Sequence, residues 1–460
     1  MQSYNTRGVA LSYSNLVMPA DQRVGKWSLT MAWWALFSAM FWIYVAVASA
    51  GAVGVPNTII GMVLTIATYG IINLVLSRYA ARTGLTVSVF SRTLFGLLGS
   101  ALASLIFAAT AIYYAVFEGS IIAVAFHEYF GGDILIWYAA VVIYAIPLAV
   151  GGVQHWLDRL NGFLLPFYFA GLIAVVIAAT VIRGVPTNWI GEAAASSALP
   201  GWLTSYLIYM GVYIMMMYTF DYARMGKRED RRFLGSVTFG WVFYAFTFGL
   251  NGLVGIYIMS AWGLEASETG VVTAFISSLG IWGVLVIFIS QTRINTANYF
   301  LASTNLSAFA HRAFGLNLPR YVWVIVSGVL AYLLMLTDVL SYLLKALAWQ
   351  GVFVTAWVAI ALTYIAINWK EERYLPEVRP GRLKPVTAGA IAWVIASATG
   401  ILLTEQTALP VVSQLTPLIT MALAGGLYYA AYKLSPPPVM DGQKDLTPEE
   451  HAELLAAEPQ

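Results

Sequence analysis

The sequence contains no cysteine and few charged residues. None of its 460 residues is cysteine, which excludes a disulfide framework and a metal site built from thiolates. Only 10% of the residues are charged, whereas a soluble globular chain has about a quarter. The four histidines are scattered and form no HExxH or triad-like pattern, and the chain has no Walker phosphate-binding loop. These absences argue against an enzyme and against an ATP-driven pump.

Apolar residues, in contrast, are abundant and are arranged in long runs. They make up 60% of the chain and recur in stretches of about twenty residues, the length that crosses a bilayer as a helix. The fold class predicted from this pattern is an all-α integral membrane protein. Twelve transmembrane helices are expected, near residues 27–51, 54–77, 97–126, 133–152, 162–182, 201–219, 234–260, 271–300, 321–337, 339–367, 386–404 and 412–432.

The placement of basic residues predicts the orientation in the membrane. If the N-terminus is cytoplasmic and the loops alternate, 21 of the 24 Lys and Arg residues fall on the cytoplasmic side. We therefore expect a multi-pass protein of the inner membrane with both termini in the cytoplasm. No signal peptide is recognised, so the first span is expected to act as its own insertion signal. The expected organisation is a cytoplasmic segment 1–26, a transporter domain 27–433 and a cytoplasmic tail 434–460.

Two charges lie inside apolar runs, Glu118 within 101–126 and Arg293 within 281–300. A charge at bilayer depth costs several kcal/mol, so it usually faces a cavity, a partner or a substrate. Gly211 lies in the middle of the sixth span, where a glycine often marks a broken helix at a binding site. The first span has no glycine or proline between Trp27 and Ala50, so the sequence does not mark any break there.

Three motifs carry a resemblance to a known family. Thr83-Gly84-Leu85, Arg92 and then Gly96 with Gly99-Ser100 open the third span. Asp221-Tyr222-Ala223-Arg224 ends the sixth span, and residues 291–298 make the eighth span polar. Together they resemble the nucleobase:cation symporter-1 family, which includes cytosine permease and the hydantoin transporter. The spacing fits over spans 1 to 8, whereas spans 9 to 12 agree only in hydropathy.

The resemblance implies a leucine-transporter-type fold, in which spans 1–5 and 6–10 form inverted repeats and two further helices follow. It also implies a secondary active transporter that works by alternating access and needs no cofactor beyond a coupling sodium ion or proton. The substrate would be a small nitrogenous heterocycle such as a nucleobase, allantoin or hydantoin. The expected partners are this substrate and the bilayer, with no nucleic acid, and the chain is expected to be a monomer.

The resemblance places the substrate between spans 1, 3, 6 and 8. Tyr114 and Glu118 are four residues apart and share one helix face, so the ring can stack on a flat compound while the carboxylate accepts hydrogen bonds. Ordinary packing of Tyr114 and a structural role for Glu118, paired with Arg293 or Lys345 or protonated, remain alternatives. The implied substrate-binding positions are Ala39, Ala111, Tyr114, Glu118, Gly211, Val212 and Gln291.

The coupling site departs from the family. Relatives hold sodium with oxygens from spans 1 and 8, and the resemblance implies that the matching positions here are Ala35, Ser38, Gln291, Ile294 and Asn295. Ile294 offers no side-chain oxygen, and the neighbouring Arg293 adds a fixed positive charge. We hypothesise that sodium coupling is lost and that transport is proton-coupled through Glu118 or facilitated. Alternatively, Arg293 points away and Asn295 with backbone carbonyls still binds sodium.

Other interpretations remain open. Lys345, seven residues after Asp338, either extends its stem to the membrane surface or acts with Glu118 and Arg293 in coupling and gating. Asp221 and Arg224 are interpreted as a structural clasp. A carrier of small amine or guanidinium cations is the alternative within transport, and a channel or membrane receptor is the alternative of another class. In the tail, Thr447–Glu450 is typical of a capping box.

Overall fold

The computed structural model describes residues 17–18, 22–150, 158–187, 189–191, 198–337, 339–369 and 375–439, without the side chains of 339–347. Its secondary structure over these ranges consists of helices and two isolated β-bridges. The Lys345 side chain and the helix expected after Thr447 lie outside the described residues.

Helices occupy all the positions at which spans are expected. Five of them are long and apolar enough to cross a membrane, or up to seven if each bent pair is one span, so the count of twelve stays a prediction. The elements are α1 (Lys26–Trp33), η3 (Leu36–Ser38), α2 (Met40–Val53), α3 (Val55–Thr83), α4 (Val87–Phe130), α5 (Ile134–Val150), α6 (Asp158–Arg183), α7 (Gly201–Met210), α8 (Ile214–Ala223), η5 (Arg228–Asp230), α9 (Arg231–Phe233), η6 (Leu234–Thr238), α10 (Trp241–Tyr244), η7 (Ala245–Leu250), α11 (Asn251–Trp262), α12 (Glu268–Leu279), α13 (Ile281–Phe314), α14 (Arg320–Met335), α15 (Val339–Ile367), η8 (Pro380–Arg382), α16 (Ala388–Thr404), α17 (Pro410–Gln414) and α18 (Thr416–Leu434).

One predicted span has the wrong bounds. The run 271–300 was expected to form a single helix, but Gly280 adopts φ +58° and ψ −130° and divides it into α12 and α13. Only glycine adopts such a conformation readily, so the helix direction changes at this residue. Helix α13 then continues to Phe314, beyond the predicted end.

Two helices are broken near their middles. The sixth span bends by 45° between α7 and α8, at the Gly211 position marked by the sequence. The first span bends by 44° between η3 and α2, where Ala39 adopts an extended ψ of 128°. This second break was not predicted, because no glycine or proline marks it. It is held instead by tertiary hydrogen bonds.

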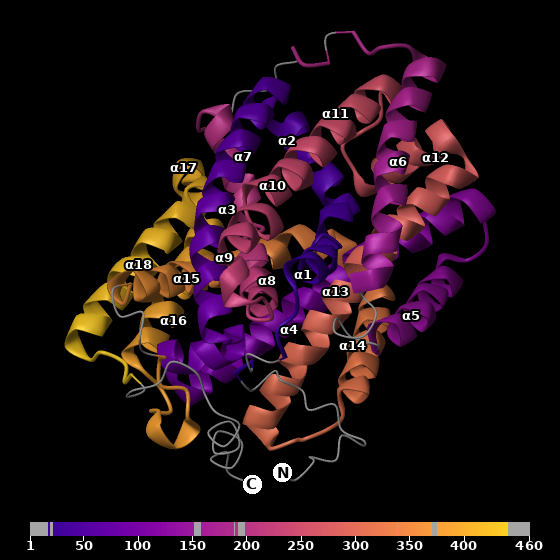
Figure 1. Cartoon of the computed structure of the whole chain (residues 1–460). Coiled ribbons are helices and arrows are strands. Elements are labelled where there is room, and N and C mark those ends of the chain that lie inside the picture. The colour runs from indigo at the N-terminus through magenta and orange to yellow at the C-terminus, as the bar shows by residue number, and fades with distance from the viewer. Residues whose placement is uncertain are drawn as a thin grey trace.

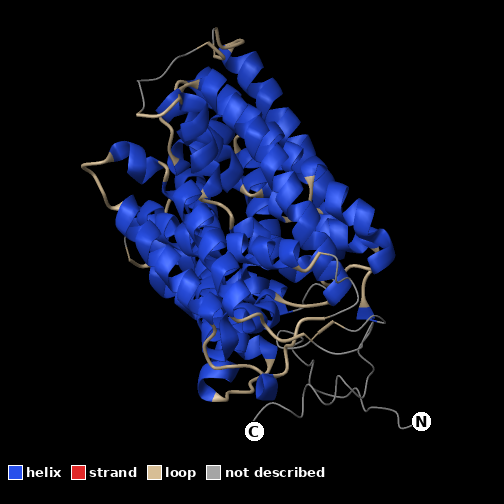
Figure 2. Ribbon diagram, turned by 90° about the vertical axis from the view of Figure 1, so that its left-hand side faces the viewer, coloured by secondary structure: helices blue, strands red, loops and turns tan. Residues whose placement is uncertain are grey.

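The helices run mostly along one direction, and the loops gather at the two ends of the bundle (Figure 2). At its centre α4 packs along α13, while α2 contacts α11 and α3 contacts both α7 and α8. Helices α15, α16 and α18 pack together at one flank, and α5, α6 and α12 lie toward the other (Figure 1). The two broken helices are therefore enclosed by long continuous ones.

Helix α4 is kinked at Gly96, which adopts φ +78° and ψ −175°. The kink frees backbone groups on both sides, and the segment 384–387 before α16 bonds them. Leu97 N donates to Lys384 O at 3.2 Å, and Leu98 N donates to Pro385 O at 2.9 Å. In the other direction the Thr387 hydroxyl donates to the Leu94 carbonyl at 2.6 Å. The segment thus replaces the missing turn of the helix.

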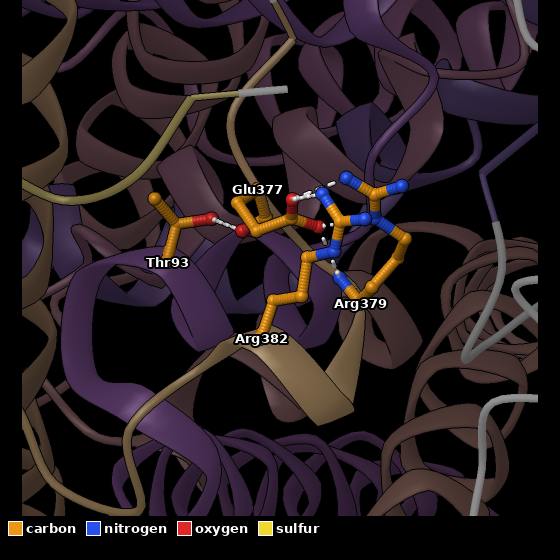
Figure 3. Close-up of polar contacts among 4 residues, drawn as sticks. All are labelled: Thr93, Glu377, Arg379 and Arg382. Atoms are coloured by element: carbon orange, nitrogen blue, oxygen red, sulfur yellow. Dashed lines mark hydrogen bonds and ion pairs between the residues drawn. The ribbon is translucent and has the colours of Figure 1, made fainter. Parts of the chain in front are cut away.

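Glu377 also links the segment between α15 and α16 to α4. The Thr93 hydroxyl donates to the Glu377 carbonyl at 2.8 Å, and Arg379 binds the Glu377 carboxylate through two nitrogens at 2.7 and 2.5 Å (Figure 3). Arg382 lies 4.0 Å from the same carboxylate. Burial raises the pKa of the Glu377 carboxyl, but the hydrogen bonds from Arg379 and the charges of Arg379 and Arg382 outweigh it and hold the pKa below its ordinary value of 4.5.

Replacing Gly96 by alanine should destabilise the protein. A Cβ at this position would lie 2.6 Å from Lys384 O, and the positive φ is strained for any L side chain. We expect Gly96→Ala to lower the free energy of unfolding by about 2 kcal/mol, measured as a lower midpoint of thermal unfolding in detergent. Gly426→Ala in α18 is the control, because a Cβ there meets no described atom within 4 Å. Equal midpoints for the two variants would contradict the prediction.

The Glu377 contacts should make stability depend on pH. Because the pKa of Glu377 is lowered in the folded state, its contribution is complete above about pH 4.5 and is lost as the pH falls through the folded value. Wild type should therefore unfold at a higher temperature than Glu377→Gln at pH 7, and the difference should shrink below pH 4.5. A difference that stays constant from pH 7 to pH 3 would show that the ionised carboxylate does not stabilise the connection.

Candidate functional site

A small cavity of about 20 Å³ lies where the two broken helices meet α4 and α13. This volume is close to that of one water molecule, so the cavity is closed to a heterocycle in this conformation. Aromatic rings make up much of its wall. The lining residues are Leu36, Ala39, Phe41, Trp42, Tyr114, Glu118, Ile214, Met215, Tyr218, Ile294 and Asn298.

Glu118 is buried in the wall of this cavity and is bonded by Gln291. The Gln291 amide nitrogen donates to the Glu118 carboxylate and, at 3.1 Å, to the Glu118 backbone carbonyl. The amide oxygen of Gln291 accepts the backbone N–H of Met40 at 3.0 Å. Met40 begins α2, where N–H groups have no partner within the helix. Gln291 therefore links the buried carboxylate to the break in the first span.

Arg293 is fully buried and reaches the other side of that break. Its Nη2 donates to the Trp34 carbonyl at 2.9 Å. Trp34 follows the last residue of α1, where the helix dipole and free carbonyls favour a positive charge. Among the described residues no group bonds Nε or Nη1 of Arg293. The guanidinium thus places its charge against the unwound backbone of the first span, and its hydrogen bond is not with Glu118.

The oxygens expected at a sodium site have protein partners. Ser290 Oγ donates to Ser38 O at 2.5 Å, and Ser38 Oγ donates to Ala35 O at 2.8 Å and to Ser290 O at 3.2 Å. Ile294 faces the small cavity, as its position in the lining shows. Asn295 lies beside α4, because a Cβ built on Gly119 would be 3.5 Å from its Nδ2. Ser38 is thus joined to Ala35 and to α13 by protein hydrogen bonds, and the Ile294 side chain adds no oxygen.

A second, larger cavity of about 460 Å³ leads away from the small one. Phe41 and Tyr114 line both cavities, and their rings meet edge to face with centroids 5.4 Å apart. Gly211 and Val212 line the larger cavity only. Its lining extends to Gln414 in α17. The two rings therefore form the partition between an open cavity and the closed centre.

On the side that carries the basic loops, hydrogen bonds join segments that are far apart in the sequence. Val24 N donates to Met225 O at 2.9 Å, and the Arg23 guanidinium donates to the Ala81 carbonyl. The Asp221 carboxylate accepts the Val87 N–H at 2.7 Å and the Asn305 amide at 3.4 Å. Asp221 thus ties the end of α8 to the starts and ends of its neighbours, as a structural clasp would.

The structure brings together only part of the implied substrate site. Ala39, Tyr114 and Glu118 line the small cavity, Gly211 and Val212 line the larger one, and Gln291 lies behind Glu118. Ala111 is buried but lines neither of these two cavities.

Sequence reasoning missed seven residues of the lining. One signal was available, since Asn298 lies seven residues after Gln291 and so falls on the same helix face. Leu36, Phe41 and Trp42 could not be placed without knowing of the break. The other three, Ile214, Met215 and Tyr218, lie on α8.

No family model matches the sequence, and no curated protein matches it either. Solved structures do match. MHP1, a nucleobase-cation-symport-1 family transporter in a closed conformation with bromovinylhydantoin bound, gives a TM-score of 0.72 at 16% identity over 96% of this chain and 99% of that one. Its inward-facing conformation gives 0.73 at 16% identity, over 99% of both chains. A substrate-bound, outward-open Na⁺-coupled sialic acid symporter gives 0.66 at 13% identity over 93% and 95%.

These comparisons establish the fold. The chain folds as these transporters do along nearly its whole length, including the last four predicted spans, for which the sequence agreed only in hydropathy. The predicted resemblance to the nucleobase:cation symporter-1 family is confirmed as a likeness of fold.

Proposed function

We propose that this protein is a multi-pass secondary transporter of the inner membrane that carries a small nitrogenous heterocycle by alternating access, with both termini in the cytoplasm. The observation that carries the proposal is the closed cavity with Tyr114 and Glu118 in its wall, set between two broken helices. Two rings separate it from an open cavity on one side, and on the other side hydrogen bonds join the segment before α1 to the segment after α8. Such one-sided access is what a carrier with a central site requires.

The paired breaks support an inverted repeat of five and five helices followed by two more. The first and sixth spans bend by nearly the same angle, 44° and 45°. Each of them is the first helix of one half of the proposed repeat. Discontinuous helices at corresponding positions of two halves are typical of such transporters, and their free ends point at the substrate.

Recognition would rest on a carboxylate and aromatic rings. The Glu118 carboxylate accepts hydrogen bonds from ring N–H groups, and Tyr114 stacks on a flat ring. The resemblance implies a second aromatic on the sixth span, but Gly211 and Val212 occupy that position in this chain and carry no ring. Phe41, which borders both cavities, supplies an aromatic face from the first span instead. A small amine or guanidinium cation would also suit a buried carboxylate among rings.

Coupling is proposed to use a proton or no ion rather than sodium. The Arg293 guanidinium bonds the Trp34 carbonyl beside the break, and the serine hydroxyls bond the carbonyls of Ala35 and Ser38. A permanent positive charge there opposes the entry of a second cation. Glu118 is the proposed proton carrier, because it lies at the central cavity.

Removing the charge of Glu118 should weaken substrate binding. We expect Glu118→Gln to bind an N–H-donating or cationic substrate roughly ten- to a hundred-fold more weakly, because a charge-assisted hydrogen bond is lost. The measurement is a thermal-shift titration with cytosine, allantoin, hydantoin and agmatine, followed by uptake of any ligand found. Glu265→Gln, at an exposed carboxylate on a loop, is the matched control. Normal transport by Glu118→Gln would make Glu118 a structural residue.

The ion dependence separates the two coupling hypotheses. In proteoliposomes an inward sodium gradient should leave uptake unchanged within about twofold, because Arg293 already supplies the charge at the break. If Glu118 carries a coupled proton, a proton gradient should stimulate uptake by wild type and not by Glu118→Gln, whereas facilitated transport should show no stimulation in either. Stimulation by sodium of several-fold would overturn the assignment of Arg293 as a substitute for the ion.

A further inference from the structure

A third cavity, of about 320 Å³, lies on the basic side of the protein and is lined by five arginines. It shares no lining residue with the central cavity or with the larger cavity above it. Neither the proposed transport pathway nor the resemblance gives it a role. Its lining residues are Arg78, Tyr79, Ala81, Arg82, Arg228, Arg231, Arg232, Ile365 and Trp369.

The fold concentrates these positive charges. Arg78 and Arg82 are four residues apart at the end of α3 and share one face, while the other three arginines come from η5 and α9. Arg228 Nε donates to the Arg82 carbonyl at 3.0 Å, which fixes the two groups side by side. The nearby Asp230 carboxylate is 3.8 Å from Lys26, outside the cavity. Like charges held this close favour a bound anion.

Among the arginines that line this cavity, one buried nitrogen has no hydrogen-bond partner in the described part of the chain. Arg78 is partly buried, and its Nε is shielded from solvent without a hydrogen-bond acceptor among the described residues. A guanidinium nitrogen that lacks an acceptor is unfavourable, so this atom indicates a ligand that brings oxygens. Arginine binds phosphate through several nitrogens at once, which makes a phosphate group the best match to this lining.

An apolar groove of about 690 Å³ continues from the arginine cavity. It shares Ile365 and Trp369 with that cavity and is otherwise lined by Val75, Leu362, Ala366 and Ile367. The groove lies along α3 and α15, which contact each other, and α3 also contacts α9 (Figure 1). Ala366 and Trp369 are exposed in it. A hydrocarbon chain would bury apolar area against such a surface, whereas a soluble phosphate compound has no apolar part to bury there.

We propose that the arginine cavity and the apolar groove together bind one anionic phospholipid from the leaflet on the basic side. The lipid phosphate would lie among the five arginines, and an acyl chain would lie in the groove between α3 and α15. Basic pockets between helices on the cytoplasmic side of membrane proteins recognise lipid head groups in this way. The occupant is a lipid and not a free phosphate, because cavity and groove are continuous.

The test uses the full chain, purified in detergent and stripped of lipid. Phosphatidylglycerol, phosphatidylcholine and inorganic phosphate are titrated separately, and binding is read by native mass spectrometry and by the thermal unfolding midpoint. We expect phosphatidylglycerol to bind at least about ten-fold more tightly than phosphatidylcholine and to raise the midpoint. Equal binding of the two lipids overturns the proposal. Stabilisation by inorganic phosphate as strong as that by phosphatidylglycerol overturns it in favour of a soluble anion.

Variants then locate the site. Arg231→Gln with Arg232→Gln removes two exposed charges and should weaken phosphatidylglycerol binding about 20-fold. Arg159→Gln with Lys433→Gln removes two exposed charges elsewhere and should change it less than twofold. Ala366→Trp fills the groove and should also weaken lipid binding. Both double variants should keep the lipid-free unfolding midpoint, and an equal affinity of the two for the lipid would overturn the assignment.

Discussion

A helix broken inside a bilayer exposes amide and carbonyl groups where no water can bond them, and this constraint shapes the centre of the protein. The first span is broken without a glycine or proline, so its conformation depends on bonds from elsewhere in the chain. Side chains bond this stretch at several points between Trp34 and Met40, including the Asn251 amide, which donates to the Phe37 carbonyl. Four more of the bonded pairs are Trp34 O with Arg293, Leu36 O with Trp42, Ser38 O with Ser290, and Met40 N with Gln291.

Three of these four side chains come from α13, which explains why an otherwise apolar helix carries a polar stretch. Gln291 accepts the Met40 N–H at the break and donates to the Glu118 carboxylate on α4. The same side chain therefore orients the buried carboxylate and stabilises the unwound backbone. Arg293 bonds the Trp34 carbonyl at the end of α1 and places a permanent positive charge there. A solved structure of the same fold comes from a Na⁺-coupled symporter. In the coupling that we propose for this chain, the Arg293 side chain takes the electrostatic role of such an ion.

The same rule applies at the kink in α4, where a connecting segment rather than a side chain replaces the lost turn. Leu97 and Leu98 find their acceptors in residues 384 and 385, and this fixes the entry of α16 against α4. The two irregular points thus differ in what supports them. The kink is bonded mainly by backbone groups of residues 384–387, together with the Thr387 hydroxyl, and the break is bonded mainly by side chains. Movement between open and closed cavities is therefore expected at the break, while α4 stays as a fixed frame.

The sequence by itself determined the membrane class, the positions of the helices and the site of one break, because apolar length and Gly211 are local signals. It also singled out Glu118 and Arg293, since any charge inside an apolar run needs an explanation. The division of 271–300 by Gly280 was missed, because a glycine within a helix is compatible with either outcome. Only the tertiary structure decided the break at Ala39, the exclusion of Ala111 from both cavities, and the place of Phe41 between them. These features depend on hydrogen bonds and packing between residues up to about 260 positions apart, such as Trp34 and Arg293, and no local pattern encodes them.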